Sequence, residues 1–291
     1  MSYYIREILP TVVEIVLLSA VVFFLWKKSS SKIYPAFTQL LQFRLGYNAA
    51  LVAVISIAHF HYLSVVPAYK LYFYSYWLGF LIDAVLVFRV VHEMYRRATV
   101  ALPGIQKLGA IAFRWAVAIS GVVAFAAALT PRGNAVDVFV TAASVTARCE
   151  SILVLCLIAF FAFAAETLGM SYRSRVFGVT FGLAMMATSN LVESAFFSGV
   201  HSLTPLVDVI ATFVQVSAMA LWLVYFLKPE PQRKLVVVET TAPLMRWNEI
   251  ARMFGNPAGQ VVVSHPASFM TDVHDVVDKV MQRRPNIGIV S

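Results

Sequence analysis

Charged and amide side chains lie inside several long apolar stretches of this chain, where an uncompensated charge is costly. Such groups usually face one another or a hydrated cavity, and there they bind protons, ions or small polar ligands. The candidate ligand-binding residues are Glu14, Asp83, Arg148, Glu150, Asn190, Glu193, Asp208 and Gln215. They predict a polar ligand site within the apolar part of the chain, with no catalytic residue and no cofactor assigned.

Spacing along a helix indicates which of these side chains share a face. Asn190 and Glu193 are three residues apart, and Asp208 and Gln215 are seven apart, so each pair lies on one side of its helix. Each of these two stretches therefore carries a polar stripe that is expected to face the others.

Depth in the membrane follows from a rise of about 1.5 Å per residue, counted from the predicted outer ends of the stretches. Asp83 and Arg148 fall near the midplane, whereas Glu14, Glu193 and Asp208 fall in the outer half. The prediction is a cavity that opens to the outside above an Asp83–Arg148 ion pair. The alternative is a set of interhelical hydrogen bonds that bind no ligand.

Carboxylates outnumber the guanidinium in this set, since Arg148 is the strong cation among Glu14, Asp83, Glu150, Glu193 and Asp208. Five carboxylates around one cation cannot all stay ionised at low dielectric, so a proton, a metal ion or an amine is the expected ligand. His59 and His61 are metal-ligand types, but two residues apart on a helix they face opposite sides. Whether a metal binds is left open.

Seven apolar stretches are long enough to cross a membrane core of about 30 Å, which takes roughly 20 residues each. They run over Ile8–Trp26, Leu40–Tyr62, Leu71–Tyr95, Ile105–Leu129, Val136–Ala164, Val176–Phe197 and Leu206–Leu227. The residues AVILMFWYC make up 60% of the chain and charged residues 13%, an excess that a soluble core could not hide. The predicted fold is an all-α bundle of seven transmembrane helices over residues 1–228.

Lysine and arginine are concentrated in alternate connecting segments, for example at Lys27, Lys28, Arg96, Arg97 and Arg175. Positive residues collect in cytoplasmic loops, so this pattern places the N-terminus outside and the C-terminus inside. The formal net charge of +8 then reflects topology and does not indicate nucleic-acid binding. The expected location is the inner cell membrane, as a multi-pass protein within the lipid bilayer.

Residues 229–291 have a mixed composition and are predicted to form a short cytoplasmic tail with two amphipathic helices. The first covers Leu244–Phe254, and the second is a stripe from Phe269 to Val280. Because such a stripe is too small to stabilise an isolated helix, we expect the tail to bind another surface. The candidates are the membrane domain, the lipid surface and a cytoplasmic protein partner.

The third stretch contains YFYSYWLGFLIDAVLVFRVVHEMYRR, and the last stretch is followed by Arg246, Trp247, Asn248 and Glu249. In these segments the chain resembles an uncharacterised family of bacterial seven-helix membrane proteins. The resemblance implies fold and compartment and supplies no site residues. A retinal protein is not indicated, because the last stretch lacks the lysine that a Schiff base needs.

These patterns favour a sensor or receptor-like protein that binds a small ligand or a proton from outside and signals through its tail. A proton- or cation-coupled transporter that uses the same carboxylates is the main alternative. A metal-dependent membrane enzyme is the third.

Overall fold

The computed structural model describes residues 2–28, 30–59, 65–129, 135–164, 171–197, 204–229 and 243–254. Every regular element in these ranges is a helix. Seven of the helices are long and apolar enough to cross a membrane. The all-helical class and the seven apolar stretches are therefore confirmed, and the chain is consistent with a multi-pass membrane protein.

The long helices begin and end within a few residues of the predicted stretches. They are α1 (Ser2–Lys27), α3 (Pro35–His59), α4 (Val65–Ala98), α5 (Pro103–Leu129), α6 (Ala135–Ala164), α7 (Arg175–Phe197) and α8 (Thr204–Leu227). The short ones are α2 (Ser30–Ile33), the 3-10 turn η1 (Thr99–Ala101) and α9 (Pro243–Phe254). The fifth apolar stretch forms one continuous helix, α6, although it carries three charged residues, Asp137, Arg148 and Glu150.

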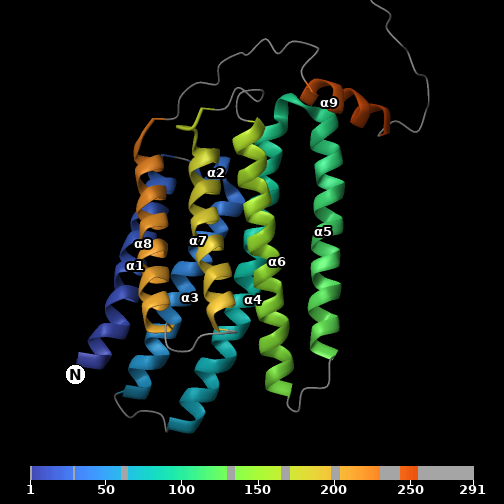
Figure 1. The fold of residues 1–291 in the computed structure, drawn as a ribbon. Helices are drawn as coiled ribbons and strands as arrows, with labels where there is room; N and C mark the ends of the chain where they lie inside the picture. The colour runs from blue at the N-terminus through green and yellow to red at the C-terminus, as the bar shows by residue number, and fades with distance from the viewer. Residues whose placement is uncertain are drawn as a thin grey trace, which may run out of the picture.

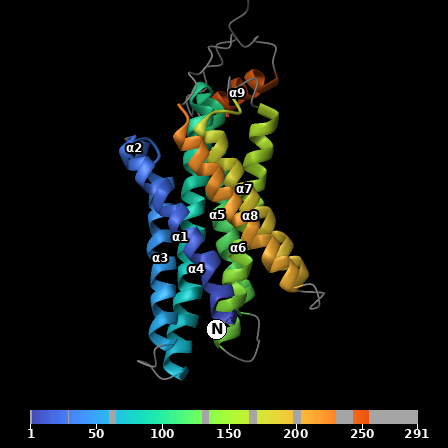
Figure 2. The same ribbon diagram turned by 90° about the vertical axis from the view of Figure 1, so that its left-hand side faces the viewer.

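Six of the long helices close a ring in the order α1, α3, α4, α6, α7 and α8, with α8 packing back on α1. The remaining helix, α5, stands outside this ring beside α6 and touches α4 less extensively (Figure 1). α9 lies across one end of the bundle, opposite the end that holds the N-terminus (Figures 1 and 2). We refer to the two ends as the α9 end and the far end.

Large apolar side chains fill the ring toward the α9 end. Phe37 of α3 packs edge-on against Trp222 of α8, with ring centroids 5.1 Å apart, and stacks on Phe226 at 5.7 Å. All three are fully buried or nearly so. The Trp222 indole donates a hydrogen bond of 3.3 Å to the Val179 carbonyl of α7, so its polar atom is satisfied. This packed half leaves the far half of the ring to accommodate polar groups.

Side chains at the α9 end satisfy backbone groups that the helix ends leave open. The Lys28 ammonium donates to the Phe226 carbonyl (2.7 Å) at the end of α8. The Ala36 amide at the start of α3 donates to the Glu93 carboxylate of α4 (2.9 Å). The hydrogen bond between Ala36 and Glu93 fixes the register between α3 and α4, because it places residue 36 at the same height as residue 93.

The first predicted tail helix is present as α9, and it packs on α5. Asn248 is buried, and its side-chain oxygen accepts hydrogen bonds from the backbone amides of Gly104 (2.9 Å) and Ile105 (3.3 Å). Two open amides of the first turn of α5 are thereby capped from a segment far along the chain. The second predicted tail helix, Phe269–Val280, lies outside the described residues.

Candidate functional site

A polar cavity of about 380 Å³ lies between α3, α4, α7 and α8, from the middle of the bundle toward the far end. Its lining comprises Arg44, Tyr47, Asn48, Leu51, Tyr76, Phe80, Asp83, Met186, Ser189, Asn190, Glu193, Ala211, Gln215 and Met219. Charged, amide and aromatic groups from four helices thus converge on one space.

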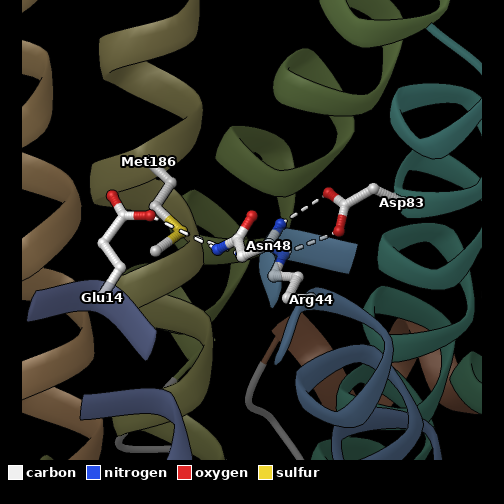
Figure 3. A network of polar contacts seen from close by, with 5 residues as sticks. All are labelled: Glu14, Arg44, Asn48, Asp83 and Met186. Carbon is white, nitrogen blue, oxygen red and sulfur yellow. Dashed lines mark hydrogen bonds and ion pairs between the residues drawn. The ribbon is translucent and has the colours of Figure 1, made fainter. Parts of the chain in front are cut away.

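An ion pair between α3 and α4 forms the floor of this cavity. Arg44 donates from Nε and Nη2 to the two oxygens of Asp83, both at 2.7 Å, and from Nη1 to the Met186 sulfur at 3.2 Å (Figure 3). The side chains are 15% and 23% exposed. This is a bidentate pair, in which two N–H groups of the planar guanidinium bind the two carboxylate oxygens and so fix the orientation of the Arg44 side chain.

The predicted Asp83–Arg148 pair is wrong. Arg148 is exposed, and its Nη2 donates to the Ser194 carbonyl at 3.4 Å, joining α6 to α7 instead. α3 and α4 are consecutive antiparallel neighbours, and the contact between Ala36 and Glu93 brings residue 44 level with the turn of α4 that holds Asp83. Arg44 therefore reaches Asp83 directly.

Two further carboxylates surround Arg44 from behind the cavity wall. Glu14 of α1 is buried and accepts a hydrogen bond of 3.5 Å from the Asn48 amide (Figure 3). Glu150 of α6 is also buried, within Coulombic range of Arg44 and Asp83. Arg148 and Glu150, two residues apart on α6, therefore lie in different surroundings. Arg44 is thus the cation around which carboxylates of α1, α4 and α6 gather.

The part of the cavity nearer the far end is lined by Asn190 and Glu193 of α7 and by Gln215 of α8. Asn190, Glu193 and Gln215 therefore face one space, as predicted from the two polar stripes, but the Asp208 half of the second stripe does not. Asp208 does not line the cavity; it is exposed, within Coulombic range of Glu193. The side chains of Glu193, Asn190 and Gln215 have no hydrogen-bond or ion-pair partner among the described residues, so their polar atoms are available to a ligand.

Tyr47 and Tyr76 form part of the cavity wall, although neither is among the predicted site residues. The Tyr47 ring lies against Gly79 of α4, and its hydroxyl donates to the Tyr76 carbonyl at 3.1 Å. Tyr76 in turn stacks on Tyr72, with centroids 6.1 Å apart. The aromatic run from Tyr72 to Trp77 is typical of an interfacial aromatic belt, so Tyr76 gave no separate signal for the cavity.

Arg44 is the main residue missed at this site, although it lies in an apolar stretch together with Asn48. The order of the helices in the sequence could have indicated its partner. Two helices joined by a short connection pack side by side and antiparallel, so an acidic residue of α4 is the first candidate to pair with Arg44 of α3.

Metal ligation has no support in the described part of the chain, where no three His, Cys, Asp or Glu side chains cluster as a metal site would require. The side chain of His59 and all of His61 lie outside the described residues.

Comparison of the chain with known protein families, curated proteins and solved structures finds no match. Inferences about function therefore rest on the geometry of the cavity.

Proposed function

We propose that this chain is a receptor-like membrane protein that binds a small cationic ligand, of the amine type, in the cavity above the Arg44–Asp83 pair. The observation that carries the proposal is the carboxylate of Glu193, which has no partner among the described side chains and faces the cavity beside the amides of Asn190 and Gln215. A carboxylate without a counterion in an apolar bundle favours a cation or a proton.

The size and lining of the cavity support an organic cation. Its volume of about 380 Å³ lies at the small end of the range for ligand pockets. Tyr47, Tyr76 and Phe80 contribute aromatic surface, which attracts ammonium groups through the ring quadrupole. The guanidinium of Arg44 is already engaged by Asp83, so it does not make the cavity a site for anions.

The proposed orientation places the far end outside the cell, because basic residues are concentrated toward the α9 end. A ligand would then enter from outside, and α9 with the following tail would carry the response to a cytoplasmic partner. Among the described residues the longest segment beyond the bundle is α9, and in this proposal it takes part in the contact with that partner.

Thermal unfolding with matched ligand pairs tests the proposal. Purified protein in detergent is heated with n-propylammonium or with n-propanol, which have the same alkyl chain and differ in charge. We expect a concentration-dependent rise in Tm with the ammonium compound and none with the alcohol. Equal shifts with both, or no shift up to millimolar ammonium, would contradict a cation site.

Transport by the same carboxylates is the alternative, and liposomes separate the two functions. Reconstituted protein is given radiolabelled propylammonium outside, with and without an inward-acidic pH gradient. A receptor binds the label without accumulation inside the vesicle. Accumulation that a protonophore abolishes, and that protein-free liposomes under the same gradient do not show, would establish a proton-coupled transporter.

A further inference from the structure

A second hollow, larger than the cavity, lies between α4 and α5 and reaches the start of α3. Its volume is about 890 Å³. The two helices are held together at the α9 end, where the Tyr95 hydroxyl donates to the Ile105 carbonyl (2.7 Å) and the Gln106 amide to the Arg96 carbonyl (3.0 Å). The hollow extends from there toward the middle of the bundle, and we call it the α4–α5 groove.

Basic side chains dominate the polar lining of the α4–α5 groove. Arg89, His92 and Arg96 lie at positions i, i+3 and i+7 on one face of α4, and Arg114 faces them from α5. His92 lies within Coulombic range of both Arg96 and Arg114. In the described residues, Arg89, Arg96 and Arg114 have no side-chain hydrogen bond or ion pair.

The one acidic residue in the lining is already engaged. Glu93 accepts a hydrogen bond from Arg97 at 2.9 Å, and its other oxygen accepts one from the Ala36 amide at 2.9 Å. Arg97 also lies over the Tyr34 ring, 4.7 Å from its centroid. The α4–α5 groove therefore has a positive charge that nothing in its described lining neutralises.

Some of this charge lies deep along the helices. Arg114 is about 16 Å from the start of α5, and Arg89 about 14 Å from the end of α4, at about 1.5 Å per residue. The His92–Phe113 contact, at 5.3 Å between centroids, sets the two helices level at this point. In a bilayer with a core of about 30 Å, such positions call for a counter-anion.

The deeper lining is mostly apolar and belongs to the side of the bundle where α5 stands apart from the ring (Figure 1). Its two hydroxyl groups, of Ser120 and Thr146, donate to backbone carbonyls of their own helices. Val85 and Phe88 contribute from α4, and Val117 and Gly121 from α5. Other apolar residues of α5 are exposed, including Trp115, which is 67% exposed. A polar anion alone would leave this deeper part unfilled, whereas a lipid supplies an anion and a hydrocarbon chain together.

We propose that the α4–α5 groove binds an anionic glycerophospholipid from the surrounding bilayer. Its phosphate lies among Arg89, Arg96 and Arg114, and an acyl chain follows the apolar lining toward Val85 and Gly121. Arginine suits this role because its fork of N–H donors matches phosphate oxygens. Basic pockets between helices bind anionic headgroups for the same reason. This site is separate from the cavity around Arg44.

Native mass spectrometry of the intact chain tests the proposal. The protein is released from micelles doped with phosphatidylglycerol, with phosphatidylcholine of the same chain length, or with inorganic phosphate. Each arginine near a headgroup contributes roughly a fivefold preference, so Arg89→Gln with Arg114→Gln should weaken phosphatidylglycerol retention about 25-fold. Lys107→Gln, on the same helix but outside the groove, should leave it unchanged.

Circular dichroism of each variant confirms that the helices are retained before binding is compared. Equal retention of phosphatidylglycerol and phosphatidylcholine would overturn the proposal, as would equal losses in the double variant and in Lys107→Gln. Displacement of phosphatidylglycerol by millimolar inorganic phosphate would overturn the lipid assignment and leave a soluble-phosphate site.

Discussion

Neutralising either partner of the Arg44–Asp83 pair is predicted to destabilise the bundle far more than neutralising both. The two bonds are 2.7 Å long and the side chains are largely buried. Removing one partner leaves the other charge unpaired, which costs about 3 kcal/mol for a buried pair. Asp83→Asn and Arg44→Gln should each lower the unfolding free energy by about that amount, and the double variant by roughly 1–2 kcal/mol.

The assay is unfolding in mixed micelles with increasing SDS, followed by circular dichroism at 222 nm. Arg148→Gln is the matched control, because Arg148 contacts the Ser194 carbonyl and not Asp83. Its effect should add to that of Asp83→Asn within about 0.5 kcal/mol. If the losses at Arg44 and Asp83 were additive and those at Arg148 and Asp83 were not, the assignment of the ion pair would be refuted.

Apolar length and helical spacing were enough to predict the helices and one of the tail elements. Predominantly apolar stretches of about 20 residues or more leave few alternatives to membrane helices, and the spacing within Leu244–Phe254 identified α9. The polar stripe with Asn190 and Glu193 was predicted to face Gln215, and all three line the cavity. The helices and the polar stripes can be predicted because they depend on the spacing of residues within one helix and on the tendency of each helix to bury its polar side in a membrane.

Partners between helices could not be obtained in the same way. Counting residues gives depth, and depth alone cannot distinguish Arg44 from Arg148 as the partner of Asp83, because a long guanidinium reaches across a full turn. The choice depends on which helices are neighbours and on the register that Glu93 sets between α3 and α4. The position of α5 outside the ring, which creates the α4–α5 groove, likewise has no signature in the sequence.

Further substitutions test the packing that supports the two sites. Asn248→Ala should lower stability by about 1 kcal/mol in the same SDS titration, because two amides of α5 lose their cap, whereas Glu249→Ala on the exposed side of α9 should have little effect. Gly79→Ala should be less stable than Gly46→Ala, since a methyl group at residue 79 meets the Tyr47 ring and one at residue 46 meets open space. A cap variant as stable as the wild type, or a reversed order of the two glycine variants, would contradict these contacts.

We expect the cavity above the Arg44–Asp83 pair to bind a cation through Glu193. Isothermal titration of n-propylammonium into the protein in nanodiscs tests it most directly, with Glu193→Gln compared with Asp208→Asn. Asp208 is the matched control because it is a nearby carboxylate outside the cavity lining. A charged hydrogen bond contributes about 1.5–3 kcal/mol, so Glu193→Gln should weaken binding roughly 10- to 100-fold, with Asp208→Asn within about threefold of wild type. Equal affinities for wild type and Glu193→Gln would contradict the account.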